Sequence, residues 1–124
     1  MDGKQPIHTK IWSLDESMVR YAPEAPGVYA LWKEGQVIYY GRTSSGEGAT
    51  IKSCLIEHIS GMRGASTRGA THYSWEIARV PAAREVELLS EFWSSFRRFP
   101  VGNQAEASLP GPRPELPPRA QSGA

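Results

Sequence analysis

Cysteine is nearly absent from this sequence of 124 residues, which contains only Cys54. One cysteine excludes an internal disulfide framework and a zinc site built from several cysteines. Long apolar runs are also missing, because the longest is the five residues from Val28 to Trp32, whereas a membrane-spanning helix needs roughly 20. No charged segment followed by an apolar one opens the chain in the manner of a secretory signal. The sequence therefore predicts a cytoplasmic protein without a membrane partner.

An excess of charge of one sign is lacking as well. The 14 Lys and Arg residues nearly balance the 13 Asp and Glu residues, which leaves a formal net charge of +1. A protein that binds nucleic acid by general attraction is usually far more basic. A nucleic-acid partner would therefore have to be held by a local basic patch.

Proline is concentrated at one end, since five of the ten prolines fall within the last 20 residues. Proline lacks the amide donor that helices and sheets need, and the segment has few apolar side chains to bury. We expect residues 105–124 to be a disordered tail, with a ligand of the PxxP type as the alternative. Residues 26–104 then form one domain, and residues 1–25 are a lead-in with one short helix.

The pattern of apolar residues indicates the elements of that domain. Residues 27–43 are two β-rich runs around a turn, residues 51–60 have helical spacing, and residues 72–80 alternate as a strand does. Pro81 opens a second helix. This order predicts an α+β fold, in which a small three-stranded antiparallel sheet led by a β-hairpin is flanked by helices.

The turn between the two β-rich runs decides which side chains meet. A two-residue turn at Glu34-Gly35 would force a positive φ on Glu34. A three-residue loop that starts at Lys33 places only Gly35 in the left-handed region. We therefore predict the longer loop, which puts Tyr29 opposite Tyr39 on one face of the sheet.

Two short motifs lie on these runs, Gly27-Val28-Tyr29 and Tyr39-Tyr40-Gly41. They resemble the motifs that give the GIY-YIG nuclease superfamily its name. Further along, His58 on the next helix, glutamates on the last helix and Asn103 after Pro-Val-Gly stand where that family has equivalents. The resemblance covers residues 26–103. It implies metal-dependent hydrolysis of DNA phosphodiester bonds, with Mg²⁺ or Mn²⁺ as the cofactor.

The resemblance also implies a role for individual side chains. Tyr29 and Tyr39 would orient or deprotonate the attacking water and contact the phosphate. His58 would accept a proton or hydrogen-bond a phosphate oxygen, and Asn103 would brace the site and bind substrate. Taken alone, two such tyrosines are more commonly a packed cross-strand pair, and a single helix histidine is more commonly a surface residue.

The implied metal ligand is a carboxylate, because Mg²⁺ prefers oxygen. Glu85 is our choice, since it lies on the apolar side of its helix, one turn before Leu88 and Leu89. Glu87 is the alternative. Glu87 and Glu91 are four residues apart on a polar face, where solvated charge is the usual explanation.

One residue departs from the family pattern. The family has an arginine four residues before the helix histidine, and this sequence has Cys54 at that position. Cysteine offers no charged donors to a phosphate, so we expect weakened nuclease activity. Arg42 is the expected catalytic substitute, and the other cations expected to bind substrate are Lys52, Arg63 and Arg68.

The alternative is a nucleic-acid-binding or interaction module on the same fold that does not catalyse. In either case the expected partner is DNA, and a protein partner is a second source of target specificity. From the sequence we expect Cys54→Arg to raise metal-dependent cleavage by at least about tenfold, because it restores a charged donor to the phosphate. The competing expectation is that Cys54 is a small buried side chain, in which case an arginine there would overpack the helix.

Overall fold

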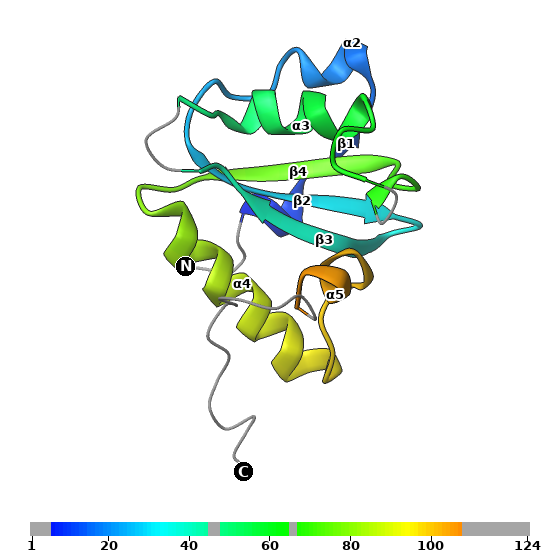
Figure 1. Cartoon of the computed structure of the whole chain (residues 1–124), viewed down its shortest axis with the longest axis vertical. Coiled ribbons are helices and arrows are strands. Elements are labelled where there is room, and N and C mark those ends of the chain that lie inside the picture. The colour runs from blue at the N-terminus through cyan, green and yellow to red at the C-terminus, as the bar shows by residue number, and fades with distance from the viewer. Residues whose placement is uncertain (1–5, 45–47, 65–66, 108–124) are drawn as a thin grey trace.

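The computed structural model describes residues 6–44, 48–64 and 67–107. In chain order its elements are α1 (Pro6–Thr9), β1 (Trp12–Ser13), α2 (Glu16–Val19), β2 (Gly27–Lys33), β3 (Gln36–Arg42), α3 (Ile51–Ile59), β4 (His72–Ile77), α4 (Pro81–Phe96) and α5 (Val101–Ala107) (Figure 1). The strands form one antiparallel sheet in the order β1-β4-β2-β3. The predicted α+β class is confirmed, and the short strand β1 is an addition to the three strands that we expected.

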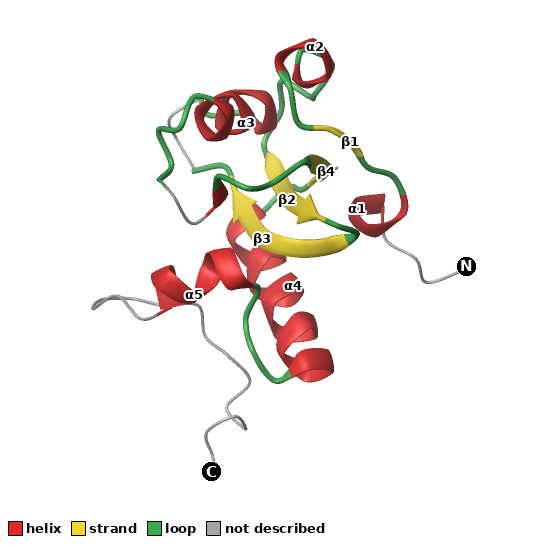
Figure 2. Cartoon of the chain, turned by 90° about the vertical axis from the view of Figure 1, so that its right-hand side faces the viewer, coloured by secondary structure: helices red, strands yellow, loops and turns green. Residues whose placement is uncertain are grey.

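The sheet lies between two layers of helices. Figure 2 shows α3 on one side of the sheet and α4 with α5 on the other. Strand side chains alternate between these sides, so two apolar clusters form. On the α3 face the cluster includes Tyr29, Leu31, Tyr39, Tyr73, Ile51, Cys54 and Leu55. On the α4 face it includes Ile7, Val28, Ala30, Tyr40, Leu88, Leu89 and Phe92.

The lead-in belongs to this fold. Ile7 of α1 is fully buried in the α4-face cluster, and Trp12 of β1 pairs with Tyr73 of β4. The expected short helix is present as α2, where the Asp15 side chain accepts a hydrogen bond from the Met18 amide. At the other end of the chain, residues 105–107 complete α5, whereas residues 108–124 of the expected tail lie outside the described residues.

The turn between β2 and β3 differs from our prediction. Lys33 pairs with Gln36, so the turn is the two-residue Glu34-Gly35, with φ of 54° and 78°. Two positive φ angles define a type I′ turn, whose twist matches that of the flanking strands. The predicted three-residue loop is wrong, because this match outweighs the cost of a left-handed glutamate.

A β-bulge then changes the register of the hairpin. Trp32 pairs with Val37 but Leu31 pairs with Tyr39, so Ile38 is an extra residue in β3. Tyr29 consequently lies opposite Gly41, and the predicted pairing with Tyr39 is also wrong. Without the bulge, the two-residue turn would have sent Tyr29 and Tyr39 to opposite faces. The bulge keeps both tyrosines on the α3 face.

Both main helices begin where the sequence predicts. Thr50 caps α3 in a capping box, in which the Thr50 side chain accepts from the Ser53 amide and the Ser53 hydroxyl accepts from the Thr50 amide. Pro81 occupies the first turn of α4. That helix ends at Arg97, whose left-handed φ of 60° lets its amide bond back to the Trp93 carbonyl.

Candidate functional site

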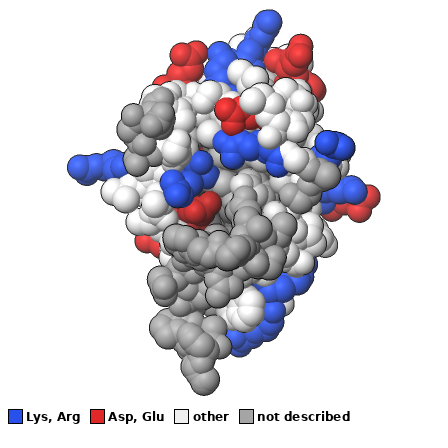
Figure 3. All heavy atoms as spheres, viewed as in Figure 1, with Lys and Arg blue, Asp and Glu red and all other residues white. Residues whose placement is uncertain are grey.

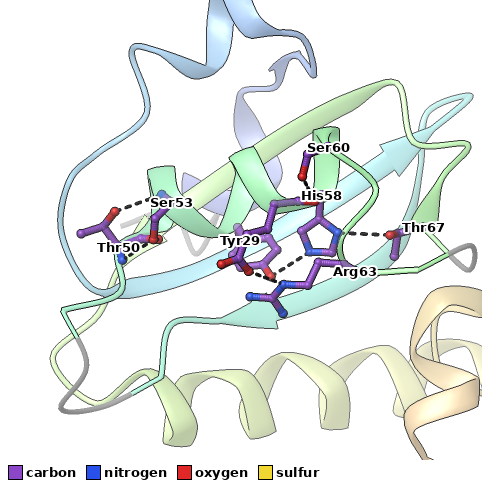
Figure 4. Close-up of polar contacts among 8 residues, drawn as sticks. Tyr29, Thr50, Ser53, His58, Ser60, Arg63 and Thr67 are labelled. Carbon is purple, nitrogen blue, oxygen red and sulfur yellow. Dashed lines mark hydrogen bonds and ion pairs between the residues drawn. The ribbon is translucent and has the colours of Figure 1, made fainter.

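Side chains from β2, β3 and α3 meet on the α3 face. Tyr29 Oη lies 3.0 Å from His58 Nε2, and His58 Nδ1 lies 3.1 Å from Thr67 Oγ1 (Figure 4). The Tyr39 ring centre is 5.3 Å from that of His58 and 6.2 Å from that of Tyr29. We call Tyr29, Tyr39, His58 and Thr67 the tyrosine–histidine cluster. Three of the residues selected from the sequence are thus brought together.

Two glycines of the motifs make this arrangement sterically possible. A Cβ on Gly41 would lie 2.5 Å from Tyr29 Oη, so the Tyr29 ring lies directly over that glycine. A Cβ on Gly27 would clash with the backbone carbonyl oxygen of Glu76 in β4 and would lie 2.8 Å from the end of the Ile51 side chain. Each glycine therefore allows a close approach: Gly41 allows that of the Tyr29 ring, and Gly27 allows that of the β4 backbone and of the first residue of α3.

The cluster is buried and polar. Tyr29 is 0%, Tyr39 5% and His58 8% exposed. Burial, and after it the nearby Arg63 charge, lowers the pKa of His58 to about 4, so the ring is neutral near pH 7. A neutral imidazole has one donor and one acceptor, which matches one bond to Tyr29 and one to Thr67. The result is a continuous chain of three hydrogen-bonding side chains.

Of the cations that we expected to bind substrate, Arg63 is the one that lies beside this cluster. Figure 4 shows its side chain, from the loop after α3, beside Tyr29 and His58. Its Nε lies 2.7 Å from Glu57 Oε1, and about a third of the side chain (34%) is exposed. Arg63 is therefore a fixed positive charge at the solvent side of a neutral cluster.

Cys54 is 2% exposed and belongs to the α3-face cluster. Burial raises the pKa of its thiol, which the neighbouring Arg63 opposes. The residue is thus a small buried side chain near the arginine rather than an ionised nucleophile.

The remaining predicted cations lie elsewhere. Lys52 Nζ pairs with Glu24 Oε2 at 3.2 Å, and Arg68 is exposed. Arg42, the last residue of β3, pairs with Glu85 of α4, with 3.3 Å between Arg42 Nε and Glu85 Oε1. Alternation along β3 explains this placement, because Arg42 points to the same side as Tyr40, toward α4. The Arg42–Glu85 pair therefore joins β3 to the helix that covers the face opposite α3.

Glu85 lies with Arg42 on the α4 side of the sheet, and none of the contacts given above for the tyrosine–histidine cluster includes it. Of the two glutamates of α4 that we considered as metal ligands, it is the less exposed. Its side chain is 15% exposed, whereas the alternative, Glu87, is 62% exposed and pairs with Arg84 at 2.9 Å. In the described part of the chain, His, Cys, Asp and Glu do not gather into a group of three or more that would hold a metal. A metal ion bound at Glu85 would therefore have to take most of its oxygen ligands from water or substrate.

Asn103 of α5 is 3% exposed and holds the outer edge of β3. Its Oδ1 accepts from the Tyr40 amide at 2.9 Å, and its Nδ2 donates to the Tyr40 carbonyl at 3.0 Å. Gly102 allows this approach, because a Cβ there would lie 2.7 Å from the Ile38 carbonyl oxygen. Both ends of the amide are engaged with backbone, so Asn103 braces the strand that carries the second motif and is not placed to bind substrate.

Sequence reasoning missed Thr67 and Glu57. Thr67 lies in a glycine-rich loop without periodicity, and Glu57 is six residues before the arginine that it holds.

Comparison with protein-family models, curated proteins and solved structures finds no match for this chain. Across the ranges 6–44, 48–64 and 67–107, no helix has the length and apolar character needed to cross a membrane. The resemblance to the GIY-YIG superfamily therefore rests on the motif residues of the sequence alone.

Proposed function

We propose that this chain hydrolyses phosphodiester bonds in DNA with the aid of Mg²⁺ or Mn²⁺. The observation that carries the proposal is the buried chain of hydrogen bonds from Thr67 through His58 to Tyr29, with Arg63 beside it. We expect the protein to act in the cytoplasm and to take its choice of target from the small domain or from a protein partner.

The three side chains have the order that proton transfer needs. A phenol with a pKa near 10 is a poor base by itself. Tyr29 is fully buried, so the proposal requires that substrate binding admits the attacking water to its hydroxyl. Tyr29 then takes the proton of that water as its own proton passes to Nε2 of the neutral His58. Thr67 holds the ring through Nδ1, as the third group does in other nucleophile–base–orienter arrangements.

Charge stabilisation falls to Arg63. Its guanidinium offers paired donors to phosphate oxygens, and it lies beside the phenol on which negative charge develops. Because the pKa of His58 is about 4, the ring is a weak base at pH 7, and we expect slow turnover. This low basicity supports the expectation of weakened activity.

A divalent ion, when bound, polarises the phosphate and stabilises the charge that forms on it. Glu85 is the residue that would hold it, and Arg42 would exchange its ion pair with Glu85 for a phosphate contact.

The second candidate is a nucleic-acid-binding module without catalysis. It is favoured by the Arg42–Glu85 ion pair, which already neutralises the proposed metal ligand, and by Cys54. In that case the same cations would bind DNA, and no bond would be broken.

Glu85→Gln separates the two candidates. We expect it to abolish Mg²⁺-dependent nicking of supercoiled plasmid, because the amide keeps the volume but loses the charge that holds the ion. The free energy of unfolding should change by less than about 1 kcal/mol, because the amide keeps the volume and shape of the side chain.

Glu87→Gln is the matched control on the same helix and should cleave like the unmodified chain. Nicking that is lost only with Glu87→Gln would move the metal ligand to Glu87. If none of the proteins nicks DNA although all bind it in an anisotropy titration, the binding-module function replaces hydrolysis.

A further inference from the structure

A separate aromatic pocket opens on the α4 face, on the other side of the sheet from the tyrosine–histidine cluster. It has a volume of about 280 Å³, and the residues that give it its character are His8, Trp32, Tyr40, Phe92, Phe96 and Arg98. We call it the aromatic pocket. Its volume is close to the lower end of the roughly 300–1,000 Å³ typical of small-molecule sites.

The polar pair in the pocket wall is neutral. Tyr40 Oη and His8 Nε2 are 2.6 Å apart. Burial raises the pKa of Tyr40 and lowers that of His8, while Glu91 and Arg84 act on both with opposite signs. The phenol therefore keeps its proton and the imidazole stays uncharged near pH 7, which gives a wall of aromatic faces with one hydrogen-bonded pair.

Arg98 supplies the charge of the pocket. Its guanidinium carbon lies 5.3 Å from the Phe92 ring centre and 5.8 Å from that of Phe96. Its Nη1 donates to the Phe99 carbonyl at 3.2 Å, and among the described residues Arg98 has no carboxylate partner. Arg97 is its exposed neighbour, and Figure 3 shows basic side chains gathered over this end of α4.

We propose that the aromatic pocket binds a nucleotide, with the base against the aromatic rings and the phosphate on Arg98. Bases stack on aromatic side chains because every base has a π-face. A guanidinium without a carboxylate partner is suited to a phosphate, with which it makes paired, charge-assisted hydrogen bonds.

Other classes of ligand fit less well. A purely apolar ligand would bury Arg98 without a counter-charge, which is costly. A cation would be repelled by the same group, and a small anion without a ring would leave the aromatic faces uncovered. A planar aromatic ring that carries an anionic group satisfies both parts of the pocket.

The nucleotide has two sources, a free mononucleotide or an unpaired base in a nucleic-acid strand. A base in an intact duplex is stacked on both faces and unable to enter. The inference rests on the proposed function only where it names a nucleic-acid strand as one source of the nucleotide. It does not require that the chain hydrolyses DNA.

The test measures binding of a labelled single-stranded octadeoxynucleotide by anisotropy, next to a duplex of the same sequence, and of deoxyadenosine monophosphate by NMR titration. We expect the single strand to bind more tightly than the duplex. The mononucleotide should shift resonances of Trp32, Phe92 and Phe96 and should bind more tightly than deoxyadenosine.

Two variants and two controls make the test specific to the pocket. Phe96→Ala and Arg98→Ala should each weaken binding of the single strand by about fivefold or more, and Arg98→Ala should also reduce its salt dependence. Ile77→Ala and Arg79→Ala are the controls, since Ile77 is as exposed as Phe96, at 57%, and Arg79 is also exposed. Both should bind within twofold of the unmodified chain.

The inference is overturned if the pocket variants bind like their controls, or if duplex and single strand bind equally. Binding by the mononucleotide alone would limit the pocket to free nucleotides. Binding is measured without a divalent ion and cleavage with one, so failure of the pocket and failure of the nuclease give different results.

Discussion

Arg63 and Cys54 are neighbours in the structure. An arginine at position 54 would have to extend along α3 toward His58, and Arg63 already lies beside Tyr29 and His58 in the structure. Glu57 fixes its guanidinium at 2.7 Å. The cation of the site therefore comes from the loop after the helix, and a small side chain at position 54 is compatible with it.

Cys54→Arg tests this relationship. The new side chain would enter a position that is 2% exposed and would meet the charge of Arg63. We expect the free energy of unfolding to fall by about 1–3 kcal/mol through overpacking, with no gain in cleavage. Ile56→Arg, at a position 49% exposed on the same helix, should be neutral in a melting experiment. A folded Cys54→Arg protein that cleaves faster would show that the site lacks a cation after all.

His58 predicts a pH dependence of stability. Its pKa is about 4 in the folded chain against 6.5 without burial, so the unfolded chain binds more protons between these values. The free energy of unfolding therefore rises with pH across this window. The contribution is complete above pH 6.5 and is lost as the pH falls through 4, by about 3 kcal/mol in total.

Denaturant unfolding between pH 4 and 7 measures this loss. His58→Gln should flatten the dependence, whereas His8→Gln should remove only the part due to His8, whose pKa is also lowered by burial. An unchanged profile in His58→Gln would mean that the imidazole is not buried in its neutral form.

Among the elements, β3 combines the most constraints. It is one of the two edge strands of the sheet. Its bulge at Ile38 sets the face of Tyr39, and Asn103 covers its outer side. An edge strand normally exposes unpaired amides and carbonyls. Here one side-chain amide of α5 pairs with both backbone groups of Tyr40, as a further strand would.

Asn103→Ala should release that edge. It leaves the Tyr40 amide and carbonyl without their partners, and we expect a loss of about 2–3 kcal/mol in the free energy of unfolding. The Tyr40 amide should also exchange its hydrogen faster in an NMR exchange experiment. Gln104→Ala is the matched control, because that amide is exposed and donates to the Phe99 carbonyl. Equal exchange rates at Tyr40 in both variants would contradict this role.

For the molecule as a whole, the sequence predicted the helices and strands whose apolar residues recur at regular spacing. The spacing of apolar residues located α3, β4 and α4, because each buries one face against the sheet. It did not predict β1, which has only two residues, or the bulge, which depends on the fit between turn and strand twist.

The candidate site was predictable to the same extent. The motif tyrosines and His58 follow from local sequence and meet in the structure. The choice of Arg63 among several cations and the contact with Thr67 depend on how a glycine-rich loop folds back, and no pattern encodes that. The Arg42–Glu85 pair lies on the α4 side because side chains alternate along β3. Our assignment of Arg42 to the phosphate did not take this alternation into account.

Tyr29→Phe tests the central claim most directly, namely that the Tyr29–His58 hydrogen bond transfers the proton in DNA cleavage. The variant keeps the ring over Gly41 and removes only the hydroxyl. We predict that the rate of Mg²⁺-dependent plasmid nicking falls by about 10²-fold or more.

Tyr73→Phe is the control, because Tyr73 is 1% exposed and its hydroxyl also makes one hydrogen bond, to the Met18 carbonyl at 2.8 Å. The control should nick plasmid at the rate of the unmodified chain. Equal nicking rates for Tyr29→Phe and Tyr73→Phe would contradict the account, since the cleavage would then proceed without the hydroxyl on which the proposed proton transfer depends.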